Sequence, residues 1–199
     1  MPSVQLPNVT FVQISKNAGT SIGNWLIDHH SPVVETWYNH PKASELPGEF
    51  KFAVVRNPWD RLVSLYSFLK NWTSPVPGTP ESESARIRNG LCILNNYTEF
   101  PDFNTWIVDL HEFRMLQWLW WGPLTNQTEW LDTKVDLVLY YENIVEDFKQ
   151  IQDLLGNTNP LPRDLASIRR EYQYYYTDAT KKFVAKAFES DIDTWKYQF

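Results

Sequence analysis

Apolar residues gather in two short runs in the first third of the chain, and each run precedes a longer amphipathic stretch. The run "VTFVQI" (9–14) predicts a buried strand, and residues 21 to about 30 predict a helix with one apolar side. The run "FKFAVVR" (50–56) predicts a second strand. The helix expected after it begins with Asn57 as N-cap and Pro58 in the first turn.

The alternation of strand and helix continues to the end of the chain. Residues 103 to about 120 have helical apolar spacing, 135–142 predict a third strand, and "VEDFKQIQDLLG" predicts a helix that ends at Gly156. A last helix is predicted after Thr177. Residues 73–102 contain much of the Pro and Gly and predict a long surface excursion. We therefore expect one α/β domain, 1–199, with a mainly parallel central sheet flanked by helices.

Charge and cysteine content limit the classes of partner. The net charge of −6 argues against a nucleic-acid partner and against a basic track for a densely sulfated polymer. An anion site would therefore have to be a local cluster of cations. The single cysteine, Cys92, excludes an internal disulfide and a thiolate metal site, and no apolar stretch approaches about 18 residues. These features predict a cytoplasmic protein without a transmembrane segment.

The segment "ISKNAGTS" (14–21) lies between the first predicted strand and its helix, where backbone N–H groups converge on an anion. Lys16 supplies charge, Gly19 allows close approach, and Thr20 and Ser21 can donate hydroxyl protons. The spacing differs from the ATP-binding loop G-x-x-x-x-G-K-[ST], because the lysine precedes the single glycine. Taken alone, the segment is equally compatible with a glycine turn beside a surface lysine.

The segment "VVRNPWDRLVSLY" (54–66) carries a second set of anion-binding side chains. Arg56 ends the second predicted strand, at the edge of the sheet where such folds bind ligands, and Ser64 follows eight residues later. A helical stripe through positions 57, 61, 64 and 68 would bring Arg61 and Ser64 to the same crevice as the first loop. A guanidinium can bind a phosphate through two hydrogen bonds, although a strand-end arginine is also common in salt bridges.

Together these segments resemble two motifs of the sulfotransferases that use 3′-phosphoadenosine 5′-phosphosulfate (PAPS). "ISKNAGTS" is similar to their 5′-phosphosulfate loop, and "FAVVRNPWDRLVSLY" to their 3′-phosphate motif. The segment "VLYYENIVEDFKQIQDLLG" and the Tyr-rich ending from "REYQYYYTDATKKF" onward extend the resemblance over nearly the whole chain. The resemblance is closest to the compact carbohydrate-type enzymes. Ser15 and Asn17 depart from the residues usual in the first motif.

The resemblance implies a P-loop-like three-layer fold and in-line transfer of a sulfuryl group from PAPS to an acceptor hydroxyl, expected to belong to a sugar, without a metal. Lys16 would stabilise charge on the leaving phosphate oxygen, and Arg56 and Ser64 would hold the 3′-phosphate. Ser167 and Arg169 are further candidates, although Leu165 replaces an Asn often found in relatives. The residues that the resemblance assigns to the 5′ side of the donor are Lys16, Asn17, Ala18, Gly19, Thr20 and Ser21.

The acceptor hydroxyl requires a base, ideally with a pKa of about 7. His40, in "WYNHPKASEL" between the two motifs, is similar in position to a histidine of the compact relatives, and Glu35 is the alternative. A loop histidine without a role is the competing interpretation. Two other functions stay open: a P-loop nucleotide or small-molecule kinase, which would need Mg²⁺ ligands and a Gly-rich loop, and an inactive relative that binds a nucleotide or a sugar.

Overall fold

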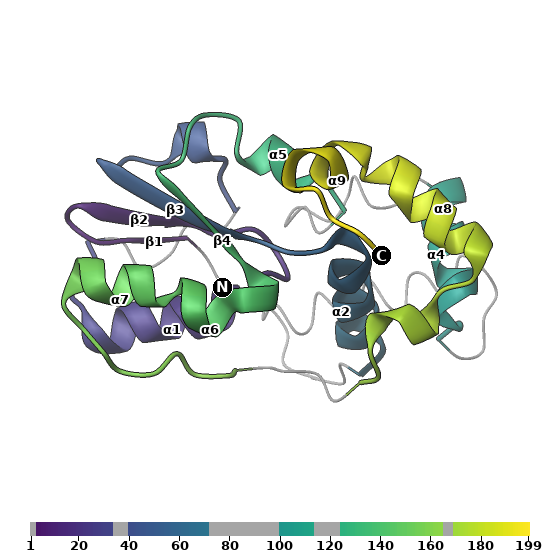
Figure 1. The fold of residues 1–199 in the computed structure, drawn as a ribbon, viewed down its shortest axis with the longest axis horizontal. Helices are drawn as coiled ribbons and strands as arrows, with labels where there is room; N and C mark the ends of the chain where they lie inside the picture. The colour runs from purple at the N-terminus through teal and green to yellow at the C-terminus, as the bar shows by residue number, and fades with distance from the viewer. Residues whose placement is uncertain (1–2, 34–39, 72–99, 114–123, 165–168) are drawn as a thin grey trace.

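The structure is a computed structural model that describes residues 3–33, 40–71, 100–113, 124–164 and 169–199 (Figure 1). Most of the surface excursion expected at 73–102 lies outside the described residues, as does the second half of the helix expected to reach about residue 120. The single-domain organisation and the excursion therefore stay predictions. Within the described part of the chain, no helix combines the length and the apolar character needed to cross a membrane.

The described strands form a four-stranded sheet in the order β1-β2-β3-β4. Strands β2 (Val9–Val12), β3 (Phe50–Val55) and β4 (Leu137–Tyr140) are parallel, which confirms the predicted sheet. Strand β1 (Val4–Gln5) pairs antiparallel with β2 and was not predicted. Two residues are too few to show an alternating pattern in the sequence.

The strand register brings the ends of β2 and β3 to the same edge of the sheet. Val12 pairs with Ala53, and Val55 pairs with Tyr140, so the carboxyl ends of all three parallel strands lie at the same edge of the sheet. The segments that follow β2 and β3 therefore leave the sheet side by side. These segments are the two motifs identified in the sequence.

Each parallel strand is followed by a helix. Helix α1 (Gly19–His29) follows β2, and α2 (Pro58–Asn71) follows β3. The predicted cap of α2 is confirmed, because Asn57 Oδ1 accepts a hydrogen bond from the Trp59 N–H at 3.1 Å. The single helix expected after β4 is instead two short helices, α6 (Ile144–Asp147) and α7 (Lys149–Leu155). As predicted, Gly156 ends α7, with a φ of 64°.

Helices and turns cover both faces of the sheet, which confirms a three-layer α/β architecture. Alternate residues of β3 point to opposite faces, so Phe52 and Val54 pack against α1, α6 and α7. Ala53 and Val55 pack on the other face against the 3₁₀ turn Ala43–Glu45 and helix α5 (Gln127–Trp130). In Figure 1, α1, α6 and α7 lie together below the sheet.

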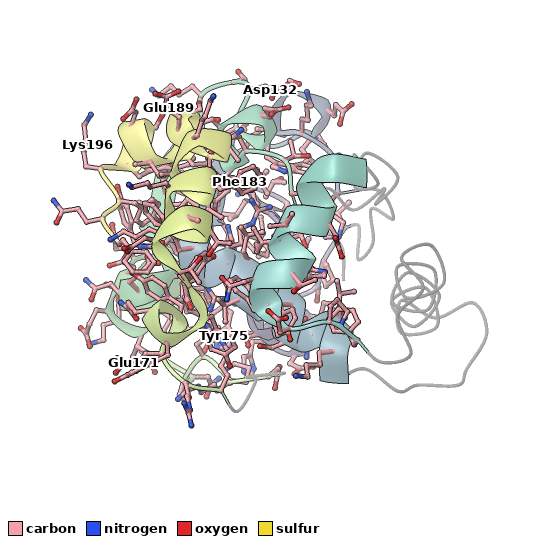
Figure 2. The ribbon with its side chains drawn as sticks, turned by 90° about the vertical axis from the view of Figure 1, so that its right-hand side faces the viewer. Asp132, Glu171, Tyr175, Phe183, Glu189 and Lys196 are labelled. Carbon is pink, nitrogen blue, oxygen red and sulfur yellow. The ribbon has the colours of Figure 1, made fainter. Side chains whose placement is uncertain are left out.

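A third apolar cluster joins α2 to helices α4 (Phe103–Phe113) and α8 (Asp178–Ala187). Its largest members are aromatic, and Trp106 is fully buried. Figure 2 shows α4 and α8 side by side. Thr177 caps α8 as predicted, by accepting a hydrogen bond from the Thr180 N–H, and α8 is followed directly by α9 (Glu189–Trp195). This cluster holds α2 in place, and α2 presents the second motif.

Candidate functional site

The loop between β2 and α1 is shaped to receive an anion. Lys16 and Ala18 both have left-handed backbone conformations, with φ of 69° and 59°, which turn successive N–H groups toward one side. Ala18 is the N-cap of α1 and offers no side-chain acceptor, and the first turn of α1 has no acidic residue. The first N–H groups of α1 and the positive end of its dipole are therefore not compensated by a side chain at this end.

Gly19 is required at the start of α1 by the packing of a neighbouring side chain. A Cβ atom at Gly19 would lie 2.2 Å from Gln13 Nε2 and 2.8 Å from Gln13 Cγ. Gln13 is buried, with 5% of its surface exposed, so its side chain has little room to move. The sequence suggested that the glycine allows a ligand to approach. The structure shows that it makes room for Gln13.

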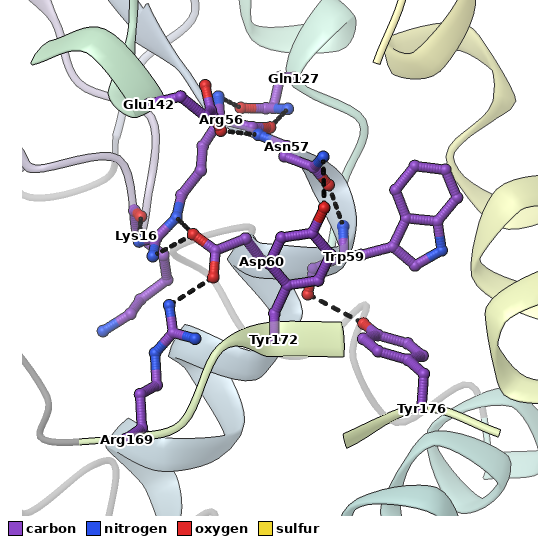
Figure 3. A network of polar contacts seen from close by, with 10 residues as sticks. All are labelled: Lys16, Arg56, Asn57, Trp59, Asp60, Gln127, Glu142, Arg169, Tyr172 and Tyr176. Atoms are coloured by element: carbon purple, nitrogen blue, oxygen red, sulfur yellow. Dashed lines mark hydrogen bonds and ion pairs between the residues drawn. The ribbon is translucent and has the colours of Figure 1, made fainter. Parts of the chain in front are cut away.

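Arg56 connects the two motifs directly (Figure 3). Its Nη1 donates to the Lys16 carbonyl oxygen at 2.9 Å. Its Nε donates to Asp60 Oδ2 at 2.8 Å, and Nη2 pairs with the same oxygen at 2.7 Å. The guanidinium also lies over the ring of Tyr141, 3.7 Å from its centroid. These contacts hold a nearly buried cation beside the loop.

Asp60 carries a second guanidinium, which comes from a distant part of the chain. Arg169 Nη2 donates to Asp60 Oδ1 at 2.5 Å (Figure 3). Asp164, a little earlier in the chain, contacts α1: its N–H donates to Ser21 Oγ at 3.0 Å and its carboxylate accepts from Asn24 Nδ2 at 2.9 Å. The structure thus places Arg169 beside Arg56 on the same carboxylate, and its contact with the donor stays a prediction. Ser167 lies outside the described residues.

Lys16 has an unusual electrostatic environment. Its Nζ lies 3.9 Å from the centroid of the Phe68 ring. Burial, and to a lesser extent the neighbouring charges of Arg56 and Arg169, lower the pKa of Lys16 to about 7. Two guanidinium groups on Asp60 and the nearby Lys16 therefore gather positive charge in a chain whose net charge is −6. The local positive cluster expected from the sequence is present.

Ser64 lies on the face of α2 that carries Asp60 and Phe68, because these positions are four residues apart. Ser64 is partly buried, and in sequence and on the helix it lies between Asp60, which binds the two arginines, and Phe68, whose ring contacts Lys16. Ser64 is thus on the predicted side of the helix. Thr20 is partly exposed, and Ser21 Oγ keeps its proton for a further hydrogen bond.

One predicted side-chain orientation is wrong. Arg61 is 1% exposed and does not face the crevice, since its Nε donates to the Ser15 carbonyl at 3.0 Å and its Nη1 to the Thr125 carbonyl at 2.8 Å. Around the helix, position 61 lies about 100° from Asp60 and about 60° from Ser64. The Asn17 side chain is also turned inward, so only its backbone is available to an anion. Its Nδ2 donates to the Val54 carbonyl at 2.7 Å and to Gln127 Oε1 at 2.6 Å.

His40 is buried at the end of the segment between the motifs. It is 8% exposed, has a φ of 42°, and packs edge-on against Trp130. Its Nδ1 lies 3.2 Å from the Gln13 carbonyl oxygen, so Nδ1 carries the proton and Nε2 is left to accept one. Burial lowers the pKa of His40 to about 4, below the value expected for an acceptor base. Glu35 lies outside the described residues, and the choice of base stays a prediction.

Three residues of this site are not predicted from the sequence. Asp60 had a local signal, because it follows Arg56 by four residues, a spacing at which opposite charges can meet. Gln127 and Asp191 had none, since both are brought to the motifs from distant parts of the chain. Gln127 and Asp191 are both fully buried.

Gly19→Ala should destabilise the protein by about 1–3 kcal/mol, because the new methyl group overlaps the buried Gln13 side chain. The free energy of unfolding, measured by denaturant titration, checks this value. In the double variant Gln13→Ala, Gly19→Ala, the added cost of the glycine substitution should largely disappear. An equal cost in both backgrounds would show that Gln13 is not the reason for the glycine.

Comparison with known proteins identifies the family. The chain is similar to the crystal structure of mouse sulfotransferase SULT7A1 complexed with PAP, at 12% identity and a TM-score of 0.45, over 93% of this chain and 84% of the mouse chain. This likeness is too distant to assign any residue. A search of curated proteins gave no match. The model of the sulfotransferase family matches residues 7–198. Because this match spans nearly the whole sequence, the chain belongs to the sulfotransferase family.

Proposed function

We propose that the protein transfers a sulfuryl group from PAPS to a hydroxyl acceptor, in line and without a metal. The observation that carries the proposal is the junction of two anion-binding elements at one edge of the sheet. The Lys16 loop and the Arg56–Arg169 pair are joined by the hydrogen bond from Arg56 to the Lys16 carbonyl. PAPS carries charged groups at its 5′ and 3′ positions, so it can occupy both elements at once.

The residues present fit this donor. The first-turn N–H groups of α1, together with Lys16, Thr20 and Ser21, supply donors and charge for the 5′-phosphosulfate. Arg56, Ser64 and Arg169 supply donors for the 3′-phosphate, and a guanidinium has five N–H groups, so contact with Asp60 leaves some of them available. A 3′-phosphate distinguishes PAPS from ATP, which supports a sulfotransferase over a kinase.

The electrostatics of the loop suit the proposed transfer. A sulfuryl group carries less negative charge than a phosphoryl group, so its loose transition state can be stabilised without a metal ion. Lys16 and the N-terminal N–H groups of α1 would stabilise the charge that develops on the leaving phosphate oxygen. Burial and the surrounding cations lower the pKa of Lys16. A bound anion would raise this pKa again, so that Lys16 becomes protonated when the donor binds.

The acceptor is assigned only by class. The net charge of −6 favours a neutral or weakly charged sugar over a sulfated polymer. A carbohydrate acceptor and a cytoplasmic location are both part of this proposal. The burial of His40 favours one second candidate, an inactive relative that binds the nucleotide and transfers nothing.

Adenosine 3′,5′-bisphosphate should bind at least about tenfold more tightly than AMP when a chelator removes metal ions. Each hydrogen bond from a guanidinium to the 3′-phosphate contributes about 1.5–3 kcal/mol. Titration calorimetry measures both affinities. Arg169→Ala should remove much of the preference, whereas Arg170→Ala, at the exposed neighbouring position, should keep it. Equal affinities of the unmodified protein for the two nucleotides would contradict the proposed donor.

Binding of the bisphosphate at about pH 8 should take up close to one proton, and much less at about pH 6. In the free protein the Lys16 pKa of about 7 leaves this amine mostly neutral at the higher pH, and a bound anion should restore its charge. Calorimetry in buffers of different ionisation enthalpy counts the protons. Lys16→Arg stays charged at both pH values and should abolish the uptake. Identical uptake by the unmodified protein and Lys16→Arg would exclude Lys16 as the group that titrates.

His40→Ala should lower turnover by about 10²-fold or more while the bisphosphate still binds, if His40 is the acceptor base. Glu35→Gln tests the alternative, and His29→Ala, at an exposed histidine, is the matched control. Steady-state turnover and nucleotide affinity are measured on the same preparations. Near-normal turnover of His40→Ala would assign the role to Glu35 or to another group. Tight nucleotide binding without turnover in the unmodified protein would support the inactive relative.

A further inference from the structure

Gln127 is a fully buried residue that contacts both motifs from a third part of the chain. Its Oε1 accepts hydrogen bonds from Asn17 Nδ2 at 2.6 Å and from the Arg56 N–H at 2.9 Å. Its Nε2 donates to the Arg56 carbonyl at 2.8 Å and to Asp191 Oδ2 at 3.0 Å. All four hydrogen-bonding positions of the amide are therefore used. Figure 3 shows this amide against the backbone of Arg56.

The contact with Arg56 continues the hydrogen bonding of the sheet by one residue. Strand β3 pairs with β4 as far as Val55, so the next residue has no strand partner in that ladder. The Gln127 amide takes the place of that partner, because it exchanges both an N–H and a C=O hydrogen bond with the Arg56 backbone. It therefore determines where the strand end directs the Arg56 side chain.

The contact with Asn17 fixes the loop of the first motif. Asn17 lies between the two residues with positive φ, Lys16 and Ala18, and its side chain is the link from the loop to the interior. That side chain donates both to the Val54 carbonyl and to Gln127. The Gln127 amide is thus hydrogen-bonded both to the Lys16 loop and to the Arg56 backbone, and it holds the two at a fixed distance.

Asp191 of α9 fixes the orientation of this amide. Its carboxylate accepts hydrogen bonds from the Gln127 N–H at 2.8 Å, from Gln127 Nε2, and from the Thr128 N–H at 3.0 Å. Because an ionised carboxylate only accepts hydrogen bonds, the NH₂ group of Gln127 must face Asp191. The oxygen must then face Asn17 and the Arg56 N–H, so the amide cannot rotate to a second arrangement.

We propose that Gln127 is a positioning residue, which sets the distance between the Lys16 loop and the Arg56 guanidinium so that one molecule with two separated phosphates can bind both. The proposal rests on the PAPS donor proposed above. Gln127 touches no ligand in this scheme. It acts by keeping two anion-binding elements in register, and its loss should affect doubly charged ligands more than singly charged ones.

The test compares ligands that occupy one element with a ligand that occupies both. In Gln127→Met, which keeps the side-chain volume and removes the hydrogen bonds, the affinity for adenosine 3′,5′-bisphosphate should fall by about 10–100-fold. The affinities for AMP and for adenosine 3′-monophosphate should change by no more than about threefold, because each element alone can still adjust to one phosphate. Calorimetry measures all three ligands.

Two further variants separate positioning from general stability. Asn17→Ala removes the hydrogen bond between the loop and Gln127 but leaves the contact between Gln127 and Arg56. It should therefore also lose affinity for the bisphosphate and keep its affinity for the two monophosphates. This variant replaces Gln127→Met in the test if Gln127→Met does not fold. Ile151→Ala creates a cavity beneath α7, a helix that carries no residue of either motif, and should leave all three affinities unchanged. An equal loss for the three ligands in Gln127→Met and Asn17→Ala, or no loss, would overturn the proposal.

A readout without nucleotide separates this proposal from the proposed donor. NMR titration of the Lys16 side chain should show a pKa of about 7 in the unmodified protein and in Ile151→Ala. The pKa should rise in Gln127→Met, because a loop that moves away from Arg56 is less buried and less repelled. If the bisphosphate shows no preference over AMP, the donor assignment fails, and this titration still decides the role of Gln127. An unchanged Lys16 pKa in a folded Gln127→Met would overturn that role.

Discussion

The parallel pairing of β2 with β3 is the constraint on which the site depends. Its register, with Val12 opposite Ala53, makes the loop before α1 and the residue after β3 leave the sheet at one edge. A shift of one residue would exchange the faces of β3, and Phe52 and Val54 would lose their positions in the core formed with α1. The same shift would separate Arg56 from the Lys16 carbonyl. The apolar packing of the sheet therefore determines the geometry of a polar site.

The cluster of cations at this edge is stable only because several neighbours reduce their mutual repulsion. Asp60 binds two guanidinium groups, and the rings of Phe68 and Tyr141 lie against Lys16 and Arg56. Repulsion by Arg56 and Arg169 still adds to burial, the larger cause, in lowering the pKa of Lys16. An anion placed among these groups would relieve repulsion that the free protein retains. A site with this charge imbalance is organised for a ligand rather than for stability.

Buried hydrogen bonds maintain the geometry of this cluster of cations. Arg61 holds the Ser15 carbonyl, Asn17 holds the Val54 carbonyl, and Gln127 holds both the loop and the Arg56 backbone. In a low-dielectric interior such bonds are strong and directional, and a buried partner left unpaired is costly. This network gives a loop of short side chains a single conformation. It also links the donor motifs to Asp191 in α9, close to the end of the chain.

The local sequence determined the elements of the fold, the two anion-binding motifs and the family. Strands β2, β3 and β4 are apolar runs, and the ends of helices are marked by Asn57, Thr177 and Gly156, whose effects act within a few residues. Only the tertiary structure decided that Arg61 and Asn17 point inward and that Arg169 shares Asp60 with Arg56. It also revealed β1 and the role of Gln127. The physical reason is range: a cap or an apolar period is set by neighbours in sequence, whereas the direction of a polar side chain is set by partners that are, for Gln127 and Asn17, 110 residues apart.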